Sequence, residues 1–402
     1  MRIAFLAHLP PWPIRSGGSR KTWHTLKAIA QCSQVDVFTL TRSPQEATQF
    51  QTQIPDWMTG TAQAFVIPRS MLQDGTAWVA AKIHGASWFI QRDRSTSLLH
   101  ALEAANRDHP YDIIWVDHLQ MWTANERAHR FPDVQWILDM HNVEGDLLHQ
   151  RASEQSLYGA LAKTDYRALA TFERMACNAA TRVIVIGEPD AKRILEHYEV
   201  PPERVRLFPP AVPLLQTQIP ANGPVLGFVG PMHWKPNRAG LEWFIKTIWP
   251  AICQHFPDAQ LRCAGVGTDL IDAVKYPANK QVFGMGYLPD LTHFWDTVHI
   301  GIAPLNTGAG IKVKLVESWG AGKPTIGTSA ATVEVPENAL FHLVADDTNA
   351  WIAAIDSLWS NPITYIERTQ EAMSHATTHH GQGTLDRNVS TLFEQLVFER
   401  HI

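Results

Sequence analysis

Short runs of apolar and β-branched residues recur along the chain and alternate with longer stretches that have a helical pattern. The runs are continuously apolar rather than alternating with polar residues, which predicts parallel strands covered by helices on both faces. The predicted strands are residues 2–7, 35–40, 62–67, 112–117, 135–140 and 181–187 in the first half, and 224–230, 260–265, 281–286, 298–305 and 324–329 in the second.

A proline-rich segment without apolar periodicity, residues 208–224, separates the two halves and has the composition of a linker. At 402 residues the chain also exceeds the length that one core usually serves. We therefore expect an α/β protein with two doubly wound domains, residues 1–213 and 214–384. A loop at 378–384 is predicted to lead into a last helix, 385–402, that packs back on the first domain. In such sheets ligands bind at the carboxyl ends of strands, so both domains would face one cleft.

Composition narrows the functional classes. A net charge of −5 with 45% hydrophobic residues describes a globular protein and disfavours general nucleic-acid binding. The four cysteines form no CxxC pair, which suits reduced thiols and gives no support for zinc. The first residues, "MRIAFLAHLPPWP", have too short an apolar run for a signal peptide, and no eighteen-residue apolar stretch follows. These features predict a cytoplasmic protein.

Residues 75–94 mix aromatic side chains such as Trp78, Trp88 and Phe89 with basic ones such as Lys82. Core packing of the aromatics is the first interpretation. The alternative is an amphipathic surface that lies peripherally on the inner face of an anionic membrane.

Two glycines, Gly17 and Gly18, stand between the first predicted strand and a helical pattern. Paired glycines at a helix start let backbone amides approach an anion closely. The spacing is not GxGxxG, so it does not predict a dinucleotide site. A plain turn is the alternative.

Polar residues follow two neighbouring strands of the first half. Asp117 and His118 end one strand, and Asp139, His141 and Glu144 follow the next. A histidine at the carboxyl end of a strand can hydrogen-bond a substrate hydroxyl or an anionic group. The residues lack the HExxH spacing of a helical zinc site, so polar lining of a cleft is favoured over a metal.

In the second half, Gly230 ends the first strand, and Lys235 and Arg238 are expected in the loop before the next helix. Cations at this edge could neutralise a diphosphate. A solvated basic loop is the alternative.

The segment "TGAGIKVKLVESWGAGKPTIGTS", residues 307–329, carries the most chemistry. Gly308 and Gly310 permit close backbone approach, and a helix is predicted from about Ile311 until the glycines before Pro324. The free N–H groups at such a helix start favour an anion by about 0.3–1 kcal/mol per charge.

Lys312 and Lys314 would add positive charge at this helix start, and Glu317 lies one turn further on. A carboxylate repels phosphate but accepts hydrogen bonds from hydroxyls, as ribose would offer. Phosphate beside a diol is the chemistry of a nucleotide. The alternative is an ordinary loop–helix connection with solvated lysines.

Taken in order, these motifs resemble the retaining glycosyltransferases of family 4, which have the GT-B fold of two facing Rossmann-like domains with an inter-domain cleft. The resemblance covers nearly the whole chain. It rests on "PPWPIRSGG", "HNVEGDLLHQR", "GFVGPMHWKPNRAG" and "GMGYLPDLTHFWDTVHIGIAPLNTGAGIKVKLVESWGAGKP".

The resemblance implies hexosyl transfer from a UDP-, GDP- or similar nucleotide-diphosphate sugar to an acceptor hydroxyl, with retention of anomeric configuration. The donor would bind to the second domain, and a glycan, lipid-linked or small-molecule acceptor to the first. No metal cofactor is expected, because the chain shows no DxD-type cluster.

By resemblance, Gly17 and Gly18 close over the diphosphate and donor sugar, and His118 falls on the active-site histidine of the family. Glu317 matches the second glutamate of the E-x7-E motif, which holds the ribose hydroxyls. The loop whose backbone reads the base is matched by Gly286, Tyr287 and Leu288.

Three positions depart from the family pattern. Ala309 replaces the first glutamate of E-x7-E, Pro231 replaces an arginine, and the usual lysine falls on or near Asn237. We therefore expect Lys312 and Lys314 to supply the positive charge. The predicted catalytic residues are His118, Lys312 and Lys314, and the predicted substrate-binding residues are Gly17, Gly18, Gly230, Lys235, Arg238, Gly286, Tyr287, Leu288, Gly308, Ala309, Gly310, Ile311 and Glu317.

Two other functions stay open on the sequence alone. One is a nucleotide-sugar epimerase or hydrolase on the same fold, which needs no acceptor. The other is a catalytically silent binding or scaffold protein, an alternative kept because of Ala309 and Pro231.

Overall fold

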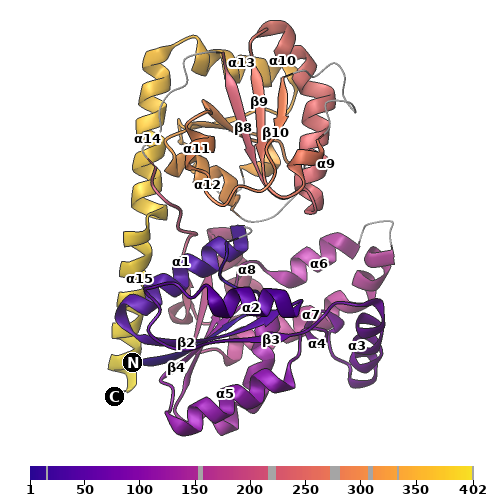
Figure 1. Ribbon diagram of the computed structural model, residues 1–402, viewed down its shortest axis with the longest axis vertical. Coiled ribbons are helices and arrows are strands. Elements are labelled where there is room, and N and C mark those ends of the chain that lie inside the picture. Colours follow the sequence, from indigo (N-terminus) through magenta and orange to yellow (C-terminus); the bar gives the residue numbers. More distant parts are fainter. Residues whose placement is uncertain are drawn as a thin grey trace. The chain divides into compact units, whose positions relative to one another are not determined.

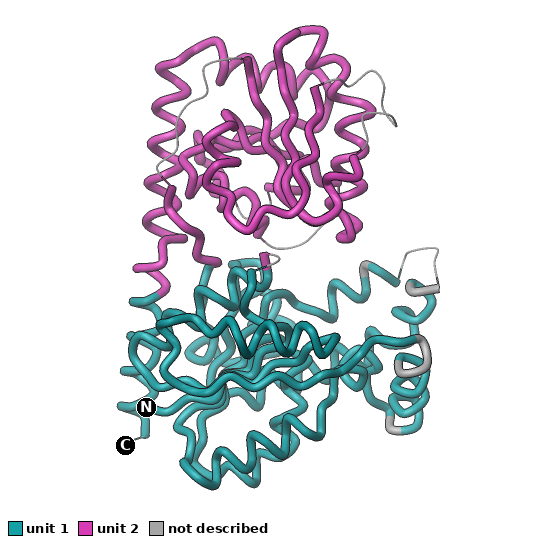
Figure 2. The backbone as a smooth tube through the Cα atoms, in the orientation of Figure 1, with its two compact units in different colours: residues 1–14, 18–209, 386–402 teal, residues 15–17, 210–385 magenta. Residues whose placement is uncertain are grey.

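The computed structural model describes residues 1–14, 17–152, 157–215, 223–271, 281–306, 311–332 and 335–400. The chain divides into two compact units, coloured separately in Figure 2. Unit 1 comprises residues 1–14, 18–209 and 386–402, and unit 2 comprises 15–17 and 210–385.

Unit 1 contains a seven-stranded parallel sheet in the order β3-β2-β1-β4-β5-β6-β7. Six of its strands match the predicted ones, which confirms the doubly wound α/β class for this unit. The seventh, β7, was missed because it has three half-buried residues with an arginine in the middle. The strands are β1 Arg2–Ala7, β2 Gln34–Thr41, β3 Ala62–Val66, β4 Ile113–Asp117, β5 Gln135–Asp139, β6 Arg182–Val185 and β7 Val205–Leu207.

Helices cover both faces of this sheet, with α1 and α5 on opposite sides of it (Figure 1). The buried strand residues pack with these helices into one large apolar cluster. The helical segments are α1 Gly17–Cys32, α2 Pro44–Thr52, α3 Met71–His84, α4 Trp88–Gln91, α5 Thr96–Asp108, the 3₁₀ segment η1 Leu119–Arg130, α6 Glu144–Ala152, α7 Leu157–Ala179, α8 Glu188–His197 and the 3₁₀ turn η2 Pro202–Arg204.

Strand register places the ends of three central strands side by side. Ala7 of β1 pairs with Asp117 of β4, which pairs with Asp139 of β5. The residues that follow these strands therefore leave the sheet at one edge, the position at which ligands bind in doubly wound sheets.

Unit 2 contains a six-stranded parallel sheet in the order β10-β9-β8-β11-β12-β13. The last strand was missed by the sequence prediction, because it is a three-residue edge strand that begins with a histidine. The strands are β8 Val225–Val229, β9 Gln260–Ala264, β10 Val282–Gly284, β11 Ile300–Ala303, β12 Thr325–Gly327 and β13 His342–Val344.

The unit 2 sheet is also enclosed by helices, and its largest apolar cluster lies between the strands, α10 and α13. The helical segments are α9 Lys235–Trp243, the π segment η3 Phe244–Ile248, α10 Trp249–His255, η4 Thr268–Leu270, α11 Thr292–Trp295, α12 Val313–Gly320, η5 Ser329–Ala331, α13 Thr348–Trp359 and α14 Pro362–His380. The last helix, α15 Gln382–Arg400, belongs to unit 1 from residue 386 on.

The loop predicted at 378–384 is wrong, because α14 runs to His380 and α15 begins at Gln382. Only Gly381 interrupts the two helices, with an extended backbone. The Gly–Gln–Gly sequence was read as a loop, but His380 is buried and continues the inward face of α14. Beyond Leu385 the chain belongs to unit 1, where Arg400 bonds to the Asp112 carboxylate at 2.7 Å.

The aromatic segment at 75–94 forms parts of α3 and α4. Trp88 and Phe89 of α4 are buried, whereas Val79 and Ile83 of α3 are exposed. In the described part of the chain, none of the helices is long and apolar enough to span a membrane.

Candidate functional site

The carboxyl edge of the unit 1 sheet carries a row of basic side chains in the spatial order of the strands. Arg42 follows β2, His8 follows β1, His118 follows β4, and His141 comes shortly after β5. The ring centres of His8 and His118 are 5.6 Å apart, and those of His118 and His141 are 3.7 Å apart. His118, which sequence analysis singled out, is therefore the middle imidazole of three.

Asp117 is the acceptor that joins two of these imidazoles. Its Oδ2 lies 2.7 Å from Nδ1 of His118, and its Oδ1 lies 2.9 Å from Nε2 of His141. The hydroxyl of Thr22 in α1 donates to the same carboxylate at 3.1 Å. With its Nδ1 held by Asp117, His118 keeps Nε2 on the far side of its ring for other partners.

The two imidazoles that share the Asp117 carboxylate, His118 and His141, have pKa values shifted in opposite directions. Burial lowers the pKa of His118, but the Asp117 charge and hydrogen bond more than offset this, so the pKa is raised. Burial, with the charges of His118 and Lys21, lowers the pKa of His141 to about 3. Burial raises the pKa of Asp117, yet the two imidazoles outweigh it and hold the pKa low. His118 is therefore the imidazole that carries a proton more readily.

A second buried pair anchors the first turn of α1. The ammonium of Lys21 bonds to Oδ1 of Asp139, and Nε1 of Trp115 donates to Oδ2 at 3.2 Å. Lys21 is 3% exposed and Asp139 is fully buried. Together with Thr22, this pair fixes the turn that contains Gly18 against the ends of β4 and β5.

Sequence analysis missed these two α1 contacts, although a signal exists. Thr22 lies four residues before Leu26 and seven before Ile29, which places a polar side chain on the buried face of the helix. A lysine or threonine on such a face needs a buried partner, because an unpaired charge or polar group there is costly.

Asp117, His118 and His141 also place ligand atoms within 4.8 Å of one another, close enough to surround a metal ion. Sequence analysis favoured polar lining here and expected no metal. The two imidazole rings are tilted at 31° to each other and both direct a nitrogen at the carboxylate, and metal independence stays a prediction.

In unit 2, a lysine and an asparagine meet where β8 ends. Nζ of Lys314, from α12, lies 2.5 Å from Oδ1 of Asn237 in α9 and 4.6 Å from the ring centre of Phe228. The amide of Asn237 donates in turn to the Pro231 carbonyl at 3.1 Å. A side chain at Gly230 would place its Cβ 2.5 Å from Asn237 Nδ2, so this approach requires glycine.

This contact connects the predicted cation Lys314 with Asn237 and, through it, with Pro231, two of the three departing positions named above. Lys314 reaches the position beside Pro231 and Asn237 at which sequence analysis found no arginine or lysine. Burial and the neighbouring charge of Lys312 lower the pKa of Lys314 to about 7, with Glu317 opposing the shift. Glu317 itself is 8% exposed on α12.

The other predicted residues of this segment are placed as follows. Ile311 precedes the helix, and Lys312 is the N-cap residue of α12. Gly308, Ala309 and Gly310 lie outside the described residues.

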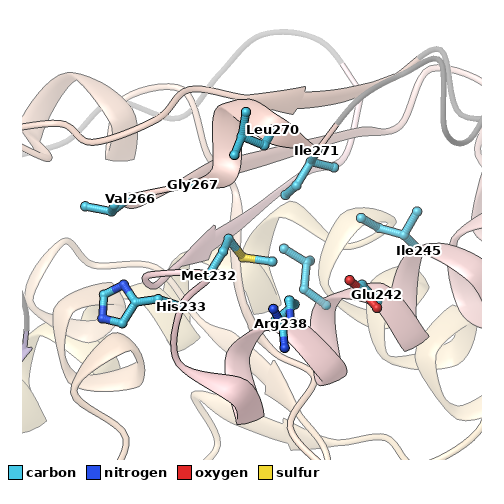
Figure 3. A pocket seen from close by; sticks show the side chains of 10 residues that line it. Met232, His233, Arg238, Glu242, Ile245, Val266, Gly267, Leu270 and Ile271 are labelled. Carbon is cyan, nitrogen blue, oxygen red and sulfur yellow. The ribbon is translucent and has the colours of Figure 1, made fainter. Parts of the chain in front are cut away.

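Lys235 and Arg238 were expected in the loop before the helix, but they lie in the first turn of α9. The loop ends earlier because Pro236 suits a first helical turn. Arg238 lines a pocket between α9 and the segment after β9, which Figure 3 shows from close by. The pocket is mainly apolar, with Met232, His233, Leu241, Glu242, Ile245, Val266, Gly267, Leu270 and Ile271 as its other lining residues.

The predicted base-reading loop follows β10. Gly286 has a φ of +66°, its N–H donates to the Thr268 hydroxyl at 3.0 Å, and its carbonyl accepts from Gly265 at 2.8 Å. Tyr287 is 43% exposed and Leu288 packs beside an apolar cluster. The turn is therefore held by its own backbone and leaves the tyrosine ring accessible.

Comparison with known proteins gives two family matches. The family described as "Glycosyl transferase 4-like domain" matches residues 16–211, and "Glycosyl transferases group 1" matches residues 223–361. A search of the curated proteins finds no match.

Solved structures with the same two-domain fold cover 97–99% of the chain. Sucrose-phosphate synthase (tll1590) from Thermosynechococcus elongatus superposes with a TM-score of 0.73 at 16% identity, over 99% of this chain and 100% of that one. Anabaena Alr3699/HepE in complex with UDP-glucose gives 0.69 at 12% identity, over 98% and 100%. WaaG, a glycosyltransferase involved in lipopolysaccharide biosynthesis, gives 0.64 at 16% identity, over 97% and 99%. At these identities the likeness is one of fold.

Proposed function

From the premise that the chain belongs to the group 1 glycosyltransferases and has their GT-B fold, we propose that it moves a sugar from a nucleotide-diphosphate sugar to an acceptor hydroxyl, with retention of anomeric configuration. The observation that carries this proposal is the meeting of Lys314, Asn237 and Pro231 at the end of β8. The leaving diphosphate needs a cation at such an edge, and Lys314 provides one in a chain that lacks the usual arginine.

The donor would bind to unit 2. Negative charge grows on the diphosphate as the bond to the anomeric carbon breaks, so a preorganised ammonium and free helix amides stabilise the transition state. Lys314 and the first N–H groups of α12 are suited to this task, with Lys312 beside them. Glu317, one turn further along, would accept hydrogen bonds from the ribose hydroxyls, and the backbone of residues 286–288 would contact the base. HepE, a neighbour in fold, was solved with UDP-glucose, which makes UDP-sugars the first donors to test.

The acceptor would bind to unit 1, with its reacting hydroxyl near His118. The transition state resembles an oxocarbenium ion. In same-face attack the departing phosphate oxygen takes the proton of the acceptor hydroxyl, so no dedicated base is needed. The role of His118 would be to hydrogen-bond a sugar or acceptor oxygen through Nε2, while Gly17 and Gly18 would lie over the diphosphate. No step calls for a metal ion.

Transfer assays with a panel of UDP- and GDP-sugars test this function. We expect turnover that depends on an added acceptor, survives dialysis against EDTA, and yields a product whose anomeric configuration, read by NMR, equals that of the donor. Acceptor-independent turnover would favour the epimerase or hydrolase. Absence of both turnover and nucleotide binding would favour a silent scaffold.

The acceptor pool should include glycans, small sugars and lipid extract. The exposed Val79 and Ile83 of α3 make peripheral contact with a membrane worth testing with the lipid-linked acceptors. A preference for acceptors in vesicles that disappears when both residues are replaced by serine would support such contact.

A further inference from the structure

A second cluster of charged groups lies beside His8 on the same sheet edge. At its centre is Asp93, whose side chain is fully buried. Its carboxylate accepts from Arg42 Nη1 at 2.8 Å and from Arg69 Nη2 at 2.9 Å, and it lies 3.2 Å from His8 Nε2. Arg92 Nε approaches to 3.7 Å and has no hydrogen-bond partner, although it is buried.

This cluster holds more positive charge than Asp93 can balance. Three guanidinium groups share one buried carboxylate. The surface Asp74 lies 3.2 Å from Arg69, and the Glu46 carboxylate accepts from the backbone N–H of Arg42 at 2.8 Å. Burial raises the pKa of Asp93, but the hydrogen bond from His8 and the charges of His8, Arg42 and Arg69 outweigh it, so the pKa is lowered. Asp93 is thus ionised, and three guanidinium groups surround this one buried carboxylate.

The guanidinium groups retain unused donors that solvent can reach. Each guanidinium has five N–H donors. Arg42 donates to Asp93 and lies beside His8, and Arg69 donates to Asp93 and Asp74. Their side chains are 23% and 29% exposed, and their remaining N–H groups have no partner among the described residues.

The cluster is continuous with the site of the reacting hydroxyl. Arg42 Nη2 lies 3.2 Å from His8 Nε2, and the His8 ring centre lies 5.6 Å from that of His118. One small molecule can therefore touch Arg42 and His118 at once.

We infer that Arg42 and Arg69 form an anion subsite, and that the acceptor carries a phosphate or carboxylate group which binds there while one of its hydroxyls lies at His118. The guanidinium fork matches both anions, since each presents two oxygens in one plane to paired N–H donors. That the molecule carrying the anion is the acceptor rests on the proposed function. The anion subsite itself rests on the geometry of unit 1 alone.

The subsite is tested first without catalysis, with inorganic phosphate as the probe. Imidazole resonances of His8 and His118 are followed by NMR while phosphate replaces chloride at constant ionic strength. We expect saturable shifts that Arg69→Gln and Arg42→Gln each weaken about tenfold or more, as loss of a charge-assisted hydrogen bond predicts. Arg94→Gln is the matched control, because Arg94 pairs with Glu126 at the surface of the same unit, and this variant should bind phosphate normally.

Thermal melts establish that each variant is folded. If Arg42→Gln does not fold, Arg69→Gln decides alone, since its side chain is the more exposed of the two. Absence of saturable shifts in the unaltered protein, or equal shifts in the Arg69 variant and the control, would overturn the subsite.

The second arm uses matched acceptors, such as glycerol against glycerol 3-phosphate and glucose against glucose 6-phosphate, with phosphatidylglycerol vesicles as the lipid source of the same chemistry. We expect a higher kcat/KM for the phosphorylated member of a pair, and Arg69→Gln should abolish this preference for the phosphorylated member. Phosphate binding without any transfer would contradict the proposed function and leave the subsite intact. Transfer that prefers neutral acceptors would overturn the anionic acceptor.

Discussion

Lys314 shows how one residue makes a binding site depend on pH. Burial favours the neutral amine of its side chain, whereas a bound diphosphate favours the ammonium. With a pKa of about 7, the free protein carries little charge at this position above neutral pH. A bound diphosphate stabilises the charged form and raises the pKa.

We therefore predict that UDP binding between pH 7 and 9 takes up a proton. Isothermal titration calorimetry in buffers of different ionisation enthalpy measures this uptake directly. Lys314→Gln should weaken UDP binding and abolish the uptake, whereas Lys246→Gln, an exposed lysine of the same unit, should change neither. Proton-neutral binding by the unaltered protein would show that Lys314 does not meet the diphosphate.

Glu317 allows a complementary test of the ribose contact. Glu317→Ala should weaken nucleotide binding strongly, because the hydroxyls would lose their acceptor. The loss should be smaller for a 2′,3′-dideoxynucleotide, which lacks those hydroxyls, when affinities are compared by calorimetry. An unchanged affinity for UDP would refute the ribose role.

Replacing Asp117 tests whether its charge raises the pKa of His118. Asp117→Asn removes the negative charge that raises the pKa of His118, so that pKa should fall and less imidazolium should be present at neutral pH. An NMR titration of the imidazole measures it, and the limb of the activity–pH profile that reports His118 should move to lower pH by the same amount. Thr22→Val, which removes an uncharged contact of the same carboxylate, is the matched control and should leave the pKa nearly unchanged. A His118 pKa that is equal in both variants would contradict the coupling.

At the scale of elements, the sequence predicted the sheets well because long apolar runs encode buried parallel strands. It missed β7 and β13, which are three-residue edge strands stabilised by pairing with a neighbour rather than by their own composition. It also predicted the helix that holds Glu317, since glycines bound that helix in the sequence. The Lys314–Asn237 contact could not be predicted, because the two residues are 77 positions apart in the sequence and lie on different helices.

The site in unit 1 likewise contains residues that the sequence predicted and residues that it did not. His118 was predicted because it ends a strand that the pattern identifies. Arg42, Arg69 and Asp93 lie in three separate segments of the sequence, and only the fold brings them together. A single arginine in a loop looks like a solvated charge until its partner is known.

The placement of helix α1 involves a buried ion pair between Lys21 and Asp139. Lys21→Met would keep the bulk of the side chain but leave the Asp139 carboxylate without its ammonium, which should destabilise the protein by about 3–5 kcal/mol at pH 7. The loss should shrink at acid pH, because an unpaired buried carboxyl has a raised pKa and its proton removes the penalty. Urea unfolding followed by circular dichroism measures both effects.

Asp139→Asn combined with Lys21→Met provides the control for this prediction. The amide keeps an oxygen for the Trp115 N–H and carries no charge, so the double variant should recover part of the stability. A single variant that costs less than about 1 kcal/mol, or a double variant no more stable than it, would show that the ion pair does not hold α1.

At the scale of the whole molecule, the chain returns to its first unit at the end. Residues 386–402 complete unit 1, where α15 buries Val389, Leu392, Phe393 and Leu396. Each such side chain contributes about 1.5–3 kcal/mol through burial. Unit 1 therefore consists of two distant segments, and its stability depends on residues that follow unit 2 in the sequence.

Leu396→Ala should consequently destabilise unit 1 by about 2–5 kcal/mol and leave unit 2 unaffected, because the cavity it creates lies in the first unit alone. Differential scanning calorimetry distinguishes the two units if they melt separately, and saturating UDP helps by raising the melting temperature of the unit that binds it. Phe398→Ala, two residues on and 67% exposed, is the matched control and should change neither transition by more than about 0.5 kcal/mol.

If the Leu396 variant instead lowered the transition that UDP raises, either α15 would stabilise unit 2 or the nucleotide would bind to unit 1. Binding of UDP to the Glu317→Ala variant would then decide between them, since only the first explanation leaves the donor site on α12.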